Sequence, residues 1–261
     1  MNPLLVLEAT GRPFVLGLDW VLTTLGVAAR AMAAIPAMRH GPARDEFLGA
    51  LRHALPGSLL AVMVAAWVLG LTLIGQGLYW LTFASQQNLI RTLMVDVLVR
   101  ELAPMLAALV LLARYGTRNI IELAAIRAGP AWRGLAGQGI DPWRTLVAPR
   151  AHAAALAGFA HTIFSVVLAA LGGHLTALVL GASTLRPVFF LATVLDGMQP
   201  RDFLLVALKG PVLGFAVVVV SAVVALASPQ LATETRRVVP RGLALTALAL
   251  PIASLLLSAV L

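Results

Sequence analysis

Three charged residues in apolar surroundings are the residues of this chain best suited to binding chemistry. Arg100 and Glu101 lead directly into an apolar segment that ends near Ala113, and Lys209, the only lysine, lies seven residues after Asp202. A charge at the centre of a bilayer costs roughly 2.5 to 3.5 kcal/mol, so an ionisable residue inside a span is a candidate functional site. Two cations and one anion buried together would form a net positive site that binds a phosphate group through charge-assisted hydrogen bonds.

The same residues also have a structural interpretation. An ion pair between Glu101 and either Arg100 or Lys209 would fix helix packing without binding any ligand. Both of their spans are entered from the outer side in the topology given below, so each charge lies about 10 Å inward at 1.5 Å per residue. The two interpretations are compatible, because one pair can pack two helices and also face a ligand.

A second candidate site precedes these charges in the chain. Gln76 stands 24 residues before Arg100, and Leu73, Trp80 and Leu81 around it would form an apolar wall suited to acyl chains. From the residue types alone, membrane-facing side chains are the simpler interpretation, since tryptophan is typical of the aromatic belt at a membrane interface.

The sequence lacks the patterns of the common catalytic and metal sites. There is no cysteine, and the five histidines show neither metalloprotease nor catalytic-triad spacing. The glycines of Gly137-Gln138-Gly139 are not followed by the Gly-Lys-Ser/Thr of a Walker loop. We therefore predict no catalytic residue, metal or cofactor in this chain, and expect any ATP and Mg²⁺ to be bound by a separate polypeptide.

The composition is that of an integral membrane protein. The chain is 60% hydrophobic and only 11% charged, and its mean hydropathy is +0.94. Its net charge of +8 comes from short basic blocks between long apolar runs. Such blocks are topology signals, so we do not predict a nucleic-acid partner.

We predict an all-α integral membrane fold with an N-terminal interfacial helix, five transmembrane helices and a cytoplasmic coupling helix. The predicted spans are residues 55–83, 93–113, 147–180, 203–227 and 242–261, and a short interfacial or re-entrant helix is expected within 181–202. Residues 1–54 would form the cytoplasmic and interfacial region, and residues 55–261 the membrane domain. Within the first region, residues 12–38 read as an amphipathic interfacial helix, with a weakly apolar extra span as the alternative. Residues 1–11 are not typical of a cleavable signal peptide.

Basic residues decide the predicted orientation. With the N-terminus inside, fourteen arginines lie in cytoplasmic segments and three, Arg91, Arg186 and Arg201, lie outside. This asymmetry places the loop 114–146 in the cytoplasm and the C-terminus, Leu261, on the periplasmic side.

Residues 99–150 resemble the MlaE family of ABC-transporter permeases, the membrane subunits that work with MCE lipid-carrier proteins. The family's successive elements match without a gap at Arg100, Glu101, Leu102 and Pro104, at Arg114 and Gly116, at Glu122 and Leu123, at Gly139, Ile140, Asp141 and Pro142, and at Pro149 and Arg150. One acidic element of the family is missing, because this chain has Pro130 and Arg133 in its place.

The resemblance implies a phospholipid-transporting complex in a bacterial inner membrane. Its expected partners are an ABC ATPase, a second permease copy in a homo- or heterodimer, and a periplasmic MCE protein, expected as a hexamer. The implied lipid-binding residues are Arg100, Glu101, Lys209, Leu73, Gln76, Trp80 and Leu81. No covalent step is expected in this chain.

The resemblance also implies that the cytoplasmic loop grips the ATPase. The expected coupling residues are Glu122, Arg127, Trp132, Arg133 and Leu135. Because the family's acids are absent here, either the partner ATPase has a matching acidic or aromatic groove, or this subunit grips its ATPase weakly. We favour the first, since Trp132 and Leu135 are three residues apart on one helical face, and tryptophan and arginine are common interface hot spots.

Two other functions stay open from the sequence. The lost acidic element is consistent with a non-coupling partner permease in a heterodimeric transporter. A membrane-embedded lipid-modifying enzyme would use Arg100, Glu101, Asp202 and Lys209, but the chain lacks the paired, spaced acids that a phosphotransferase or metal site needs.

Overall fold

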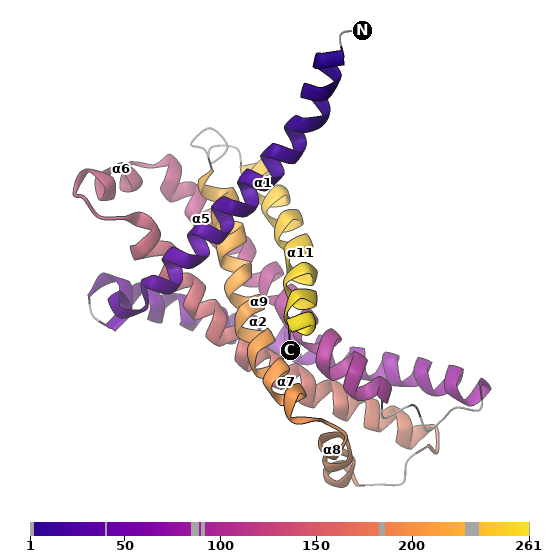
Figure 1. Cartoon of the computed structure of the whole chain (residues 1–261). Coiled ribbons are helices and arrows are strands. Elements are labelled where there is room, and N and C mark those ends of the chain that lie inside the picture. The colour runs from indigo at the N-terminus through magenta and orange to yellow at the C-terminus, as the bar shows by residue number, and fades with distance from the viewer. Residues whose placement is uncertain are drawn as a thin grey trace.

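The computed structural model describes residues 3–39, 41–84, 89, 92–182, 186–227 and 235–260, and every regular element in these ranges is helical. Four helices among them are long and apolar enough to cross a membrane. They are α2 (Pro42–Phe83), α7 (Ala148–Val179), α9 (Pro200–Leu226) and α11 (Thr235–Val260). This arrangement confirms the all-α membrane fold (Figure 1).

The predicted second span is a run of three consecutive helical segments. The segments η3 (Leu93–Leu102), α4 (Ala103–Leu111) and η4 (Leu112–Gly116) are joined by residues with right-handed helical dihedral angles. At about 1.5 Å per residue the run is about 36 Å long, enough to cross a hydrocarbon core of about 30 Å. Its first and last segments have π-helical hydrogen bonding, which is often found at functional sites.

The N-terminal region is helical but has different bounds from those predicted. Helix α1 covers Pro3–Ala33 and is followed by η1 (Ile35–Arg39). Figure 1 shows α1 extending well beyond the other helices at its N-terminal end. Helix α2 then begins at Pro42, so residues 54 and 55, the predicted limit between the two regions, lie within one helix. The interfacial position of α1 stays a prediction.

Helix α7 is packed closely against α2 through glycines. A methyl group at Gly70 would lie 1.9 Å from the carbonyl oxygen of Ala169, and one at Gly172 would lie 2.5 Å from that of Trp67. The Thr176 hydroxyl donates a hydrogen bond of 3.1 Å to the Leu71 carbonyl. Only glycine allows this backbone approach, which is the usual way to pack helices in a membrane.

The other side of α7 packs against α9 in the same way. A methyl group at Gly158 would lie 2.4 Å from the carbonyl oxygen of Gly210, and one at Gly214 would lie 2.2 Å from that of Ala154. Small residues four apart on both helices thus form this crossing. As a result, α7 is the central helix, with α2 and α9 held on either side.

The connecting helices lie at opposite ends of this group. Helices α5 (Thr117–Ala128) and α6 (Pro130–Gly137) continue from η4 at one end, and α8 (Pro187–Asp196) lies at the other (Figure 1). Helix α8 confirms the short helix predicted within 181–202. The last predicted span begins earlier than expected, at Thr235, while Arg91 and Leu261 lie outside the described residues.

Candidate functional site

The three charges singled out in the sequence meet in one cluster. Lys209 Nζ lies 2.6 Å from Glu101 Oε1 and donates a hydrogen bond of 2.7 Å to the Arg100 carbonyl oxygen. Lys209 has no exposed surface, so its charge depends on these partners inside the protein. The structural interpretation of an ion pair between Glu101 and Lys209 therefore describes this contact.

The Arg100 side chain points to two aspartates instead of to Glu101. Its Nε lies 2.6 Å from Asp202 Oδ1, and its Nη1 lies 2.6 Å from Asp96 Oδ1. Asp202 is fully buried, and its Oδ2 accepts a hydrogen bond of 2.7 Å from the backbone N–H of Gln199, which caps α9. Asp202 thus holds the guanidinium and the start of α9 together.

The carboxylate of Glu101 also receives two hydroxyl groups from the last helix. Ser258 Oγ donates to its Oε1 at 2.7 Å and Ser254 Oγ to its Oε2 at 3.2 Å. Ser254, Ser258 and Asp96 were not predicted as site residues. Each had a sequence signal, since the serines are four residues apart in an apolar span and Asp96 is four residues before Arg100.

The expected excess of positive charge is wrong for this cluster. Asp96 and Asp202 join Glu101, and Arg201 Nε lies 4.0 Å from Asp202 Oδ1. The described members are therefore three cations and three carboxylates, with no formal excess. The prediction failed because the spacing of Arg100 and Lys209 did not reveal which carboxylates the fold would bring to them.

One ion pair of the cluster is accessible. The Asp96 side chain is 43% exposed, whereas its partner Arg100 is 18% exposed. A polar cavity of about 210 Å³ lies at this point, lined by Thr92, Val95, Asp96, Arg100, Gly197, Gln199 and Arg201. Arg100 thus has one fully buried partner, Asp202, and one partly exposed partner, Asp96, which lies beside the cavity.

The predicted apolar wall lies on the C-terminal half of α2. Leu73 is partly buried and packs against the core around Ile74 and Met94, while Gln76 and Trp80 are exposed. Leu81 is half-buried. Trp80 meets Tyr79 edge to face at 5.4 Å. Neither Gln76 nor Trp80 takes part in the hydrogen bonds of the charge cluster, so their role in lipid binding stays a prediction.

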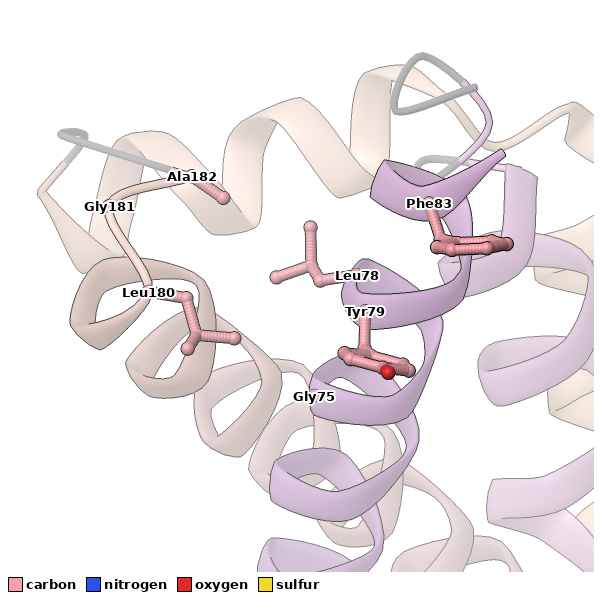
Figure 2. Close-up of a pocket in the computed structure, with 7 residues that line it drawn as sticks. All are labelled: Gly75, Leu78, Tyr79, Phe83, Leu180, Gly181 and Ala182. Atoms are coloured by element: carbon pink, nitrogen blue, oxygen red, sulfur yellow. The ribbon is translucent and has the colours of Figure 1, made fainter. Parts of the chain in front are cut away.

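A larger apolar cavity lies beside this wall. It has a volume of about 660 Å³ and is lined by Gly75, Leu78, Tyr79 and Phe83 of α2 and by residues 180–182. Figure 2 shows Leu78 and Leu180 directed into the gap between the two segments. Gly181 adopts a positive φ of 70°, a conformation that favours glycine and turns the chain after α7. The cavity adjoins the predicted residues but does not include them.

The predicted coupling residues are divided between two environments. The Arg127 guanidinium lies 4.8 Å from the centroid of the Trp132 ring, and Trp132 meets Trp143 edge to face at 6.3 Å. Arg133 is exposed and Leu135 half-buried, and no residue of α6 is buried. This surface is open to a partner.

Glu122, in contrast, is already engaged within the chain. Its Oε1 lies 2.6 Å from Arg118 Nε, and its Oε2 lies 3.0 Å from Arg150 Nη1. Arg150 also bonds Glu46 of α2. Arg150 matches a family element but had no predicted role, and Glu46 was not predicted as a site residue.

Comparisons with known proteins agree with the resemblance. The family model described as Permease MlaE matches residues 47–260. A probable ABC transporter permease protein of Rickettsia prowazekii (strain Madrid E) is 27% identical over 169 residues, which cover 65% of this chain and 63% of that protein. A similarly named protein of Rickettsia typhi (strain ATCC VR-144 / Wilmington) is 26% identical with the same coverage. The match thus spans less than two thirds of the length of these relatives.

Proposed function

The chain belongs to the MlaE permease family, and from this premise we propose that it is the permease subunit of an ABC-type transporter that moves phospholipids between the inner and outer membranes. The observation that supports this proposal most directly is the charge cluster of Arg100, Glu101, Asp202 and Lys209 within the membrane-spanning helices. Charged groups inside a span are costly and typically mark a substrate path.

The exposed pair of Arg100 and Asp96 gives the lipid headgroup a specific place to bind. A phosphate would replace the Asp96 carboxylate and accept charge-assisted hydrogen bonds from Arg100. Arg201, which lines the same cavity, adds a second cation at its rim. The acyl chains would extend over the apolar residues of outer α2, including Leu73, Trp80 and Leu81.

The proposed complex contains further subunits. A cytoplasmic ABC ATPase would bind and hydrolyse ATP with Mg²⁺ and would contact α6 through Arg127, Trp132, Arg133 and Leu135. A second permease copy, identical or different, would complete the path, and a periplasmic MCE protein would continue it. The location is a bacterial inner membrane, with the N-terminus in the cytoplasm and the C-terminus in the periplasm. This chain itself would carry out no covalent step.

A lipid-modifying enzyme is the less favoured alternative. Glu101 and Asp202 are each held by a cation at 2.6 Å. A carboxylate that is fixed in such a pair is a poor general base, because its negative charge is already compensated. A non-coupling partner permease remains the second transport hypothesis, and α6 is the element that distinguishes it.

Bound phospholipid provides the test. We expect Asp96→Asn to increase the phospholipid that co-purifies with the complex, because it removes the competitor for Arg100. Arg100→Lys should decrease it, because lysine keeps the charge but loses the planar set of donors. Bound lipid is measured by mass spectrometry after purification from membranes, with Arg144→Lys, an exposed arginine at the other end of the molecule, as the control.

Transport is measured in parallel with labelled phospholipid in vesicles that contain the reconstituted complex. Equal amounts of bound lipid in the wild type and both variants would show that the headgroup does not bind at Arg100. A wild-type complex that moves no phospholipid would overturn the proposed function as a whole.

A further inference from the structure

The inner ends of three helices are joined by one buried arginine. Arg150 is the third residue of α7 and its side chain is only 10% exposed. Its Nε lies 2.5 Å from Glu46 Oε1 of α2. Its Nη1 lies 3.0 Å from Glu122 Oε2 and donates a hydrogen bond of 3.3 Å to Asn119 Oδ1, both on α5. A single guanidinium therefore connects α2, α5 and α7.

Asn119 extends the network to a fourth helix. Its Nδ2 donates a hydrogen bond of 3.3 Å to Ser221 Oγ of α9, and this hydroxyl donates at 3.1 Å to the Val218 carbonyl. Asn119 is 1% exposed and Ser221 is fully buried. The buried polar groups are thus satisfied by one another, which fixes the relative positions of the helices that carry them.

The charges within this network balance. Arg118 and Arg150 face Glu46 and Glu122, so the network has no excess charge with which to attract an ionic ligand. Both carboxylate oxygens of Glu122 contact arginines of the same chain. Its role is therefore better described as internal than as a contact with the ATPase.

The network lies directly behind the proposed ATPase surface. Only Gly129 separates α5, which carries Glu122 and Asn119, from α6, which has no buried residue. On the other side, Arg150 begins α7, the helix that α2 and α9 contact through glycines. A cavity of about 210 Å³ lies between the network residues Glu46, Glu122 and Arg150, so the network is not enclosed by tight packing on this side.

Building on the proposed function, we propose that Arg150 is the positioning residue that transmits a displacement of the α5–α6 segment to the membrane-spanning helices. The Arg150 side chain is only 10% exposed, so leaving its guanidinium without a carboxylate partner is unfavourable, and the ends of α2, α5 and α7 would move together rather than separately. Packed side chains and networks of hydrogen bonds and salt bridges can carry coupling of this kind, and the guanidinium supplies such contacts at the first turn of the central helix.

The substitution Arg150→Lys separates charge from geometry. Lysine keeps the positive charge, but a single ammonium group cannot reproduce the planar donors that reach Glu46, Asn119 and Glu122 together. The complex with its ATPase is reconstituted in vesicles, and transported phospholipid and hydrolysed ATP are both measured. We expect at least a tenfold fall in phospholipid moved per ATP hydrolysed.

Two further variants keep the test decisive. Glu46→Gln loosens the link at α2 without altering α5 or α6, and it should lower the same ratio while the ATPase still co-purifies. Arg144→Lys, an exposed arginine six residues before Arg150, is the matched control and should keep the wild-type ratio. A purely structural role would reduce the amount of assembled complex but would not change the ratio for each assembled complex.

The outcomes separate this inference from the proposed function. Wild-type ratios in both Arg150→Lys and Glu46→Gln would overturn the inference alone, and Glu46→Gln decides the matter if Arg150→Lys does not fold. A wild-type complex that binds no ATPase or moves no phospholipid would overturn the proposed function and this inference with it.

Discussion

Lys209 shows how a single buried charge shapes this protein at the scale of residues. Its ammonium group has no exposed surface and is held by the Glu101 carboxylate and the Arg100 carbonyl. Glu101 has additional donors in Ser254 and Ser258, and its side chain is 38% exposed. The two partners are therefore unequal, because the lysine depends on the glutamate more than the glutamate depends on the lysine.

This inequality predicts the order of two substitutions. Glu101→Gln leaves Lys209 buried without a counter-charge, and the free energy of unfolding should fall by about 3–5 kcal/mol. Lys209→Met should cost less, because the serines and solvent still stabilise Glu101, but it should impair transport. The measurement is thermal unfolding of the purified protein in detergent, with the double variant completing the cycle. Additive losses in the double variant would show that the two charges do not interact.

At the scale of elements, α5 and α6 make different contacts, although the sequence predicted a single coupling role for the loop that contains them. Glu122 and Asn119 of α5 face the membrane helices through Arg150. Helix α6 exposes Arg133 and keeps Trp132 against Arg127 and Trp143. The contacts of Trp132 with Arg127 and Trp143 hold α6 in place, and Arg133 is exposed on this helix.

The exposed position of Arg133 predicts a selective effect on assembly. Arg133→Glu restores an acid near the place where the family has one, and it should reduce co-purification of this protein's own ATPase at least tenfold if that partner has an acidic or aromatic groove. Trp132→Ala should weaken binding as well, with some loss of stability from its lost ring contacts. Pull-down yield and lipid-stimulated ATP hydrolysis are the readouts. Unchanged values in both variants would exclude α6 as the docking element and favour the non-coupling permease.

At the scale of the whole molecule, the arrangement of the helices and the distribution of arginines both distinguish one end of the molecule from the other. Helix α6 lies at one end of the central group and α8 at the other (Figure 1). Most arginines precede or follow the spans on the side of α6, while only Arg91, Arg186 and Arg201 are assigned to the other side. The positive-inside rule therefore predicts that the α6 end faces the cytoplasm.

Tags at two positions test this orientation. A cysteine or epitope introduced within residues 128–138 should react only after the inner membrane is permeabilised, whereas a tag after Leu261 should be accessible from the periplasm in intact spheroplasts. A tag within residues 187–196 provides a periplasmic control. If the C-terminal tag were protected like the cytoplasmic one, the order of five spans would be wrong.

The sequence by itself determined the kind of protein and the main apolar helices, although not where α1, α2 and α11 begin. Long apolar runs require helices because no water is available in the bilayer to bond the backbone, and the motifs from Arg100 to Arg150 indicated the permease family. The arginine pattern likewise predicted an orientation without any knowledge of packing.

Only the tertiary structure decided which side chains meet. An ion pair of Glu101 with Arg100 or Lys209 was expected, and Lys209 makes it. The Arg100 side chain pairs instead with Asp202, 102 positions along the chain, and Arg150 pairs with Glu46, 104 positions away. Such partners depend on how closely α7 approaches α2 and α9, and that approach is set by glycines such as Gly70 and Gly214. A glycine allows another helix to approach closely, but it does not show which residue of that helix will lie opposite. The charge balance of the site and the position of Arg150 therefore followed only from the packed helices.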